Sequence, residues 1–210
     1  HKLFDEAIVN ARDHHVRMAT SIAACKPVLP VTKIEATFHE DGSITVLNDG
    51  EGLDVAKHPE LDMWIPEMVF GKLRTSTNYV KSDKKIVGGK NGFGFKLVLI
   101  WSEWGEIETV DNRRGLKYTQ SFEKNLGGAC PPKVTKCKAK PYTRVRFKPD
   151  YQRLGLTGLS SDMLALMQRR VFEIAAVTDK SVRVKLNGEM VPVRHFRQYI
   201  QLYPAMAQRG

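Results

Sequence analysis

Several features that would mark particular classes of protein are scarce or missing in this sequence of 210 residues. It has three cysteines, an odd number without the spacing of metal ligands, so it gives no indication of a disulfide framework or a zinc site and suits a reducing compartment. No apolar run reaches the roughly 18 residues of a membrane helix, so we expect no membrane partner. There is also no internal repeat and no low-complexity stretch. These absences leave a globular domain of ordinary apolar content, 42%.

Positive charge is in excess. The formal net charge is +10, from 33 lysines and arginines against 23 acidic residues. Such a balance favours a polyanionic partner, with nucleic acid the leading case, although a basic domain without such a partner is the alternative. The densest basic stretch, "KVTKCKAK" at 133–140, has four lysines and no aromatic residue. It is typical of a loop that contacts a nucleic-acid backbone or is simply solvated.

The periodicity of apolar residues predicts interspersed helices and hairpins. Helical spacing covers residues 1–18 and 160–178, and alternation around Asp-Gly and Asn-Gly turns predicts hairpins over 33–52 and 181–193. Residues 105–124 are a further hairpin candidate, residues 142–150 a strand, and residues 194–203 a short helix. We therefore expect an α+β two-layer sandwich, a mixed and mainly antiparallel sheet with helices on one face. No linker divides the chain, so residues 1–210 are predicted to form one domain.

The stretch "GGKNGFGFK" at 88–96 is rich in glycine and matches neither of two common phosphate-binding motifs. Phe95 stands where a P-loop has its lysine, and Leu97 stands where a dinucleotide fingerprint has its third glycine. Converging backbone N–H groups before an apolar, helix-like run at 97–101 could still bind an anion. An ordinary glycine-rich turn is the alternative. The pattern that remains is G-x-x-G-x-G-x-K, formed by Gly89, Gly92, Gly94 and Lys96.

Three further groups of polar residues could carry chemistry. Glu6 and Asn10 lie four residues apart on the first predicted helix, so they share one face as a possible general base and Mg²⁺ ligand. "NDGEG" at 48–52 follows a strand and could turn against a flat ligand, and "TSTNY" at 75–79 could close over phosphates. Taken singly, these groups could equally be a solvated helix face, a plain turn and an ordinary polar loop.

The order of these motifs resembles the GHKL ATPase (Bergerat) fold family, which includes type II topoisomerases, large heat-shock chaperones, MutL proteins and histidine kinases. "FDEAIVNARDH" is similar to the "FDE-x-x-VNAADN" helix of eukaryotic-type DNA topoisomerase II, and the resemblance is to a cellular or viral enzyme of this type. "TSTNY" resembles "TSSNY" of that family, and "GGKNGFGFK" resembles "GGRNGYGAK". The resemblance extends over nearly all 210 residues.

The resemblance implies a role for each matching residue. Glu6 polarises the attacking water, Asn10 holds Mg²⁺, and Asn48 binds the adenine edge with help from Thr143. Lys96 supplies positive charge to the reacting phosphates. The other positions implied to contact ATP are Gly50 and Gly52 in the turn, Ser76, Thr77 and Asn78 in the polar loop, and Gly89, Lys90, Asn91, Gly92, Phe93 and Gly94 in the phosphate-binding lid.

Two departures from the family pattern put parts of this site in doubt. His14 stands where an asparagine is expected, so its nucleotide contact is open, and Phe95 replaces a small residue within the lid. The resemblance also implies a strap before these residues and a transducer after them, which this sequence lacks. We therefore expect the 210 residues at best to bind nucleotide weakly as a monomer, with hydrolysis far below that of the full chain.

The implied function is binding and hydrolysis of ATP with Mg²⁺, which drives DNA strand passage and relaxation of supercoils by a type IIA topoisomerase. The full-length enzyme would act on double-stranded DNA as a homodimer, in the nucleus or, for a viral enzyme, in the nucleus or viral factory. The alternatives are a GHKL ATPase module of a chaperone, a MutL-like protein or a chromatin ATPase, and a non-catalytic basic domain that binds nucleic acid.

Overall fold

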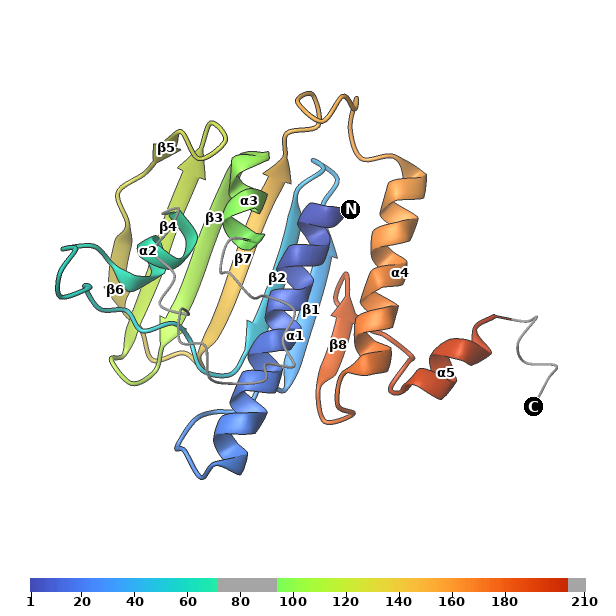
Figure 1. Cartoon of the computed structure of the whole chain (residues 1–210), viewed down its shortest axis with the longest axis horizontal. Coiled ribbons are helices and arrows are strands. Elements are labelled where there is room, and N and C mark those ends of the chain that lie inside the picture. The colour runs from blue at the N-terminus through green and yellow to red at the C-terminus, as the bar shows by residue number, and fades with distance from the viewer. Residues whose placement is uncertain (72–93, 204–210) are drawn as a thin grey trace.

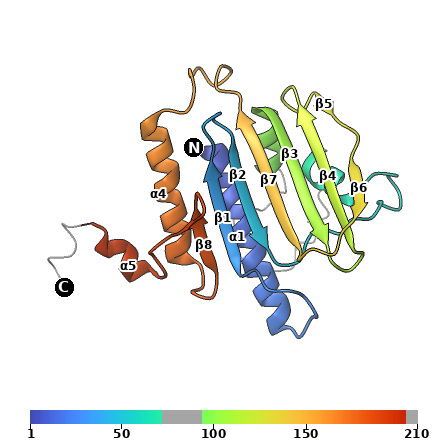
Figure 2. The ribbon, with the colours of Figure 1, turned by 180° about the vertical axis from the view of Figure 1, so that it is seen from behind.

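The described part of the protein is a two-layer assembly of one sheet and five helices. A computed structural model of the chain describes residues 1–71 and 94–203. Four helices, α1 (Lys2–Ala23), α2 (Ile65–Gly71), α3 (Gly94–Ile100) and α4 (Ser161–Val177), lie in front of the sheet in Figure 1, and α5 (Phe196–Gln201) lies beside α4. Figure 2 shows the opposite face of the sheet without any helix in front of it. The predicted α+β sandwich with helices on one face is confirmed.

The sheet is mixed and mainly antiparallel. Its order is β5-β4-β3-β7-β2-β1-β8-β9, and β6 pairs with β4 beside β5. The pairing of β1 with β8 is parallel, whereas every other strand pair in the described part of the chain is antiparallel. The strands are β1 (Lys33–Phe38), β2 (Ile44–Asp49), β3 (Ser102–Asp111), β4 (Leu116–Glu123), β5 (Gly128–Ala129), β6 (Lys133–Lys136), β7 (Tyr142–Pro149), β8 (Arg183–Leu186) and β9 (Glu189–Met190).

The core lies between the sheet and the helices because both have one apolar face. In β2, Ile44 and Val46 are buried and alternate with half-exposed residues. Helix α1 covers them with Phe4, Ala7 and Ile8, spaced at helical intervals. Asn48 continues the inward-facing row of β2 but is polar. A buried polar group at the end of an apolar row requires a hydrogen-bond partner, which draws attention to this end of the sheet.

Most predicted elements are present, and one prediction was wrong. The two hairpins with Asp-Gly and Asn-Gly turns form β1–β2 and β8–β9, and Ser160 caps α4 by accepting a hydrogen bond from Met163 N at 3.2 Å. The basic stretch 133–140 was expected to be a loop, whereas Lys133–Lys136 is strand β6. Its structure depends on pairing with β4, which its own composition does not reveal. No helix in residues 1–71 and 94–203 is long and apolar enough to cross a bilayer.

Candidate functional site

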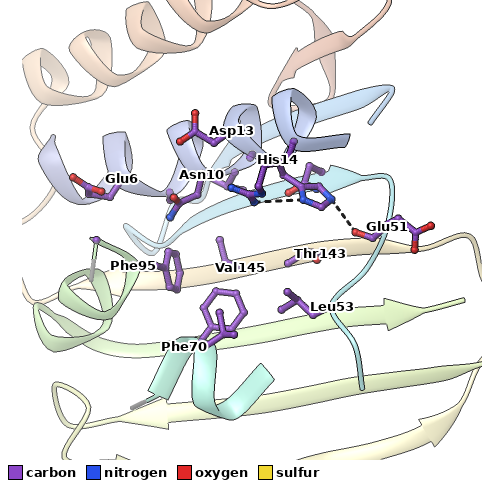
Figure 3. Close-up of a pocket in the computed structure, with 17 residues that line it drawn as sticks. Glu6, Asn10, Asp13, His14, Glu51, Leu53, Phe70, Phe95, Thr143 and Val145 are labelled. Atoms are coloured by element: carbon purple, nitrogen blue, oxygen red, sulfur yellow. Dashed lines mark hydrogen bonds between the residues drawn. The ribbon is translucent and has the colours of Figure 1, made fainter. Parts of the chain in front are cut away.

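A cleft of about 230 Å³ lies between α1 and the sheet (Figure 3). The ends of β2 and β7, the loop after β2, α2 and the start of α3 complete its wall. Its volume is below the roughly 300–1,000 Å³ of pockets that hold whole drug-sized ligands, so a nucleoside triphosphate in it would extend beyond these walls. The predicted residues that line it are Glu6, Asn10, Asn48, Gly94 and Thr143, together with His14 and Phe95.

Helix α1 places Glu6 and Asn10 along one side of the cleft, as their spacing predicts. The Glu6 side chain is 36% exposed, and Lys2 Nζ lies 3.8 Å from Glu6 Oε1. Gly94 at the start of α3 lies directly against this carboxylate, because a Cβ at that position would be 2.2 Å from Glu6 Oε2. A side chain at position 94 would therefore force the Glu6 carboxylate to shift from this position.

Asn48 and Thr143 lie side by side at another part of the cleft, on the paired strands β2 and β7. Asn48 is 7% exposed and its Nδ2 donates to the Asp49 carbonyl at 2.9 Å, so the amide orientation is fixed. Within the described residues, its Oδ1 has no hydrogen-bond partner and can accept from a ligand. Thr143 Oγ1 lies 3.1 Å from Thr109 Oγ1, which itself accepts from Leu53 N at 3.0 Å. This region is built to present an amide oxygen and a hydroxyl to a flat polar ligand.

The rest of the "NDGEG" turn shapes the backbone around the cleft. The Asp49 carboxylate accepts hydrogen bonds from Thr32 N and Lys33 N, both at 2.7 Å, and so ties β2 to the segment before β1. Gly50 has φ +94°, which favours glycine, and a Cβ at Gly52 would lie 1.9 Å from the carbonyl oxygen of Val110. Asp49, Gly50 and Gly52 are not among the lining residues, and contact of the two glycines with ATP stays a prediction.

His14 joins α1 to the loop that follows β2. Its Nε2 donates to the Glu51 carbonyl at 2.9 Å, as the dashed line in Figure 3 shows. Burial, with a smaller contribution from the nearby Arg17 guanidinium, lowers the pKa of His14 from 6.5 to about 4. The imidazole is therefore neutral near pH 7, and its Nε2 carries the proton. Arg17 also lines the cleft, three residues after His14 on the same helix face. We did not single it out from the sequence, although the spacing Asn10–His14–Arg17 places it there.

Phe95 and Lys96 are both buried in α3 but face different surroundings. The Phe95 ring packs edge-on against Phe70 at 5.1 Å and Phe147 at 6.3 Å, so the bulky residue that departs from the family pattern forms part of the cleft wall. Lys96 is 2% exposed and is not among the lining residues, and burial lowers the pKa of its ammonium group. Its phosphate contact stays a prediction. The predicted residues Ser76, Thr77, Asn78, Gly89, Lys90, Asn91, Gly92 and Phe93 lie outside the described residues.

The donor groups fit a metal carried by a ligand better than a metal held by protein alone. No group of three or more His, Cys, Asp or Glu side chains in residues 1–71 and 94–203 could hold a metal ion. Asn10 offers one amide oxygen in the cleft, and its side chain makes no hydrogen bond within those residues. Mg²⁺ commonly has few protein ligands and completes its octahedron with phosphate oxygens and water. An Mg²⁺–triphosphate complex fits this arrangement.

Comparisons with curated proteins find DNA topoisomerase 2 from many sources, although no family model matches the chain. The Arabidopsis thaliana protein is 43% identical over the whole chain, and that of Acanthamoeba polyphaga mimivirus is 42% identical over 97% of it. The chain spans only 14% and 15% of the length of these two relatives.

Solved structures give the same result. The ATPase region of Saccharomyces cerevisiae topoisomerase II superposes with a TM-score of 0.88 at 40% identity, over 97% of this chain and 52% of that one. The ATPase and transducer domains of the Balamuthia mandrillaris enzyme give 0.86 at 38% identity, over 96% of this chain and 50% of that one. The ATPase domain of Thermus thermophilus gyrase B gives 0.66 at 22% identity, which supports the fold alone. The chain therefore belongs to the DNA topoisomerase II family and corresponds to part of its GHKL-fold ATPase region.

Proposed function

We propose that the chain binds ATP with Mg²⁺ in the cleft and hydrolyses it, as the ATPase module of a type IIA topoisomerase. The observation that carries the proposal is the distribution of polar groups in one cleft. A carboxylate and an amide, Glu6 and Asn10, line it from α1, and a fixed amide oxygen and a hydroxyl, Asn48 and Thr143, line it from the sheet. The first pair suits a metal-bound triphosphate and water, and the second suits a nucleobase.

Each residue has a role that follows from its chemistry. Asn48 Oδ1 accepts from the exocyclic amino group of adenine, and Thr143 adds a hydroxyl beside it. Asn10 gives one oxygen ligand to Mg²⁺, and Glu6 accepts a proton from the attacking water. When bound, the metal neutralises charge on the phosphates. Lys96 and the predicted residues within 76–78 and 89–94 would contact the ribose and phosphates, and Gly50 and Gly52 would hold the turn beside the base.

We further propose that hydrolysis serves DNA strand passage and supercoil relaxation in a homodimeric enzyme that acts on double-stranded DNA. The support is the identity of the relatives, which are DNA topoisomerases from plants, fungi and a virus. These sources also favour a location in the nucleus or, for a viral enzyme, the viral factory. None of the compared proteins named above is a chaperone or a MutL-like protein, so the alternative GHKL classes receive no support.

Calorimetric titration with a non-hydrolysable ATP analogue tests the proposal. Binding should require Mg²⁺ for full affinity, and Asn10→Ala should abolish the difference between Mg²⁺ and EDTA. Thr37→Ala, on the helix-free face of β1, is the matched control and should bind as the parent does. Absence of nucleotide binding, together with salt-dependent binding of DNA, would support the non-catalytic nucleic-acid-binding alternative instead.

A further inference from the structure

Helix α1 is held against α4 by an ion pair directly beside the proposed catalytic carboxylate. Arg170 Nε of α4 donates to Asp5 Oδ1 of α1 at 2.6 Å, and the two side chains are 31% and 15% exposed. This charge-assisted bond joins residues 165 positions apart in the sequence. Asp5 also accepts from Lys2 Nζ at 3.2 Å. The first turn of α1 is thus fixed to α4 at the position next to Glu6.

The geometry of the helix makes this contact relevant to Glu6. Successive residues of an α-helix are about 100° apart around the axis, so Asp5 faces α4 while Glu6 faces the cleft. The first turn has no side-chain cap from His1, and Phe4 anchors it to the core. The buried residues Ala7, Ile8 and Ala11 and the His14–Glu51 bond limit rotation of α1 along its length, and the Asp5–Arg170 bond adds a constraint at the first turn.

Little rotation is tolerable, because the carboxylate of Glu6 touches the backbone of α3. A Cβ at position 94 would lie 2.2 Å from Glu6 Oε2, so Gly94 leaves space for the carboxylate and nothing larger. A turn of α1 about its axis would move Glu6 into α3 or away from the cleft. Displacements of about 1 Å can cost about 10²-fold in rate when they misplace a reacting group.

Arg170 is in turn held from α5. Its Nη1 donates to Glu173 Oε2 at 3.0 Å, and the other oxygen of Glu173 accepts from Tyr199 OH of α5 at 3.0 Å. Arg169 Nε also donates to Glu173 at 3.0 Å but has no contact with Asp5. Four side chains, Asp5, Arg170, Glu173 and Tyr199, therefore form a continuous series of hydrogen bonds from the turn that carries Glu6 to α5.

We infer that Arg170 is a positioning residue for Glu6, acting through Asp5, and that α5 biases this positioning through Tyr199 and Glu173. The inference rests on the proposed ATPase function. It gives α4 and α5 an indirect effect on hydrolysis, without contact between either helix and the nucleotide. None of the four side chains lines the cleft, so the series can be interrupted at any of them without altering a residue of the cleft.

Steady-state ATPase rates, with nucleotide affinity measured by calorimetry on a non-hydrolysable analogue, test the inference. Arg170→Ala should lower kcat about 10- to 100-fold and change Kd less than about 2-fold, since misplacement of the base affects the reaction rather than binding. Arg170→Lys should restore part of the rate. Arg183→Ala, at an exposed position of β8 outside this series, is the control and should stay within about 3-fold of the parent in kcat.

A double-mutant cycle and a variant of α5 separate positioning from general support of the fold. Asp5→Asn combined with Arg170→Ala should be no slower than the slower single variant, because both interrupt one contact. Tyr199→Phe should lower kcat in the same direction by a smaller factor. Additive losses in the cycle, a parental kcat in Arg170→Ala, or an equal fall in affinity and rate would overturn the inference. These rates are measured in the full-length enzyme, and if its parent form hydrolyses no ATP, it is the proposed function that fails.

Discussion

Two parts of the cleft hold their polar groups in different ways. On the side of Asn48, Thr143 and His14, each side chain has a hydrogen-bond partner within the described residues, at 2.9–3.1 Å. On the side of Glu6 and Asn10, the only partner within those residues is Lys2, 3.8 Å from Glu6. The first side combines the paired strands β2 and β7 with His14 of α1, which bonds to the loop after β2, whereas the second side lies on α1 alone.

Under the proposed function, this difference would separate recognition of the base from hydrolysis. Groups fixed before the ligand arrives lose little entropy on binding, so the Asn48 side is suited to discriminate a base. Groups without internal partners can take on a metal, phosphate oxygens or water without first breaking a bond. Changes on the Asn48 side should therefore alter affinity or stability, and changes on the Glu6 side should alter rate.

The largest expected effect is that of Glu6→Gln. The change is nearly isosteric and keeps the packing against Gly94, but the amide cannot accept a proton from water. We expect kcat to fall about 10²–10⁴-fold with nucleotide binding retained. Turnover measured in the parent and variant, beside Glu103→Gln on the helix-free face as a control, checks this. Hydrolysis at the parental rate would remove Glu6 from the role of base.

The second expected effect is on the pH dependence of stability and concerns His14, on the Asn48 side of the cleft. The pKa of His14 is lowered to about 4 from 6.5, so between these pH values the unfolded chain binds a proton that the folded protein does not. The corresponding stability is complete above pH 6.5 and is lost as the pH falls toward 4, amounting to at most about 3 kcal/mol. His14→Asn, which inserts the residue of the family pattern, should flatten the acid side of the curve. Urea unfolding between pH 4 and 7 measures this, and parallel curves for parent and variant would contradict it.

Lys96→Ala tests whether a buried lysine serves the phosphates. If its charge acts on the nucleotide, the variant should lose about 1.5–3 kcal/mol of ATP affinity and little affinity for adenosine. Because Lys96 is 2% exposed, the substitution also alters packing in α3, which affects both ligands alike. Calorimetry with ATP and adenosine separates the two effects. Equal losses for both ligands would assign Lys96 to the structure alone.

Local sequence patterns were sufficient for most of the fold. Helix α1, helix α4 and the Asp-Gly and Asn-Gly hairpins follow from periodicity and turn residues that lie within about 20 positions of one another. Strand β6 was missed because its four residues are ordered by β4 rather than by their own composition. The same limit explains why the Asp5–Arg170 pair could not be foreseen, since only the packed structure brings the two together.

In the site, the sequence predicts which residues of α1 face the cleft, but it does not predict the tertiary contacts of the glycines. Glu6 and Asn10 share the cleft because i and i+4 share a helix face. The ligand contacts predicted for Gly52 and Gly94 stay predictions, and the structure shows in addition that these glycines allow close approaches to the carbonyl of Val110 and to the carboxylate of Glu6. The local sequence does not indicate such tertiary contacts except by the presence of the glycine.

The smallest expected effect is that of Thr143→Val, which sharpens the contrast between the two sides. Valine keeps the shape of threonine and removes the hydroxyl that lies 3.1 Å from Thr109 Oγ1. If this hydroxyl helps to hold the base, affinity for adenosine and for ATP should fall by the same factor, about 2- to 10-fold, or roughly 0.5–1.5 kcal/mol. The value of kcat should be unchanged, because Glu6 and Asn10 are untouched. Calorimetry with both ligands, beside Thr37→Val on the helix-free face, decides the matter. A loss of affinity confined to ATP, or a fall in kcat at saturating nucleotide, would show that Thr143 acts on the reacting groups. The contrast between the Asn48 side and the Glu6 side would then be wrong.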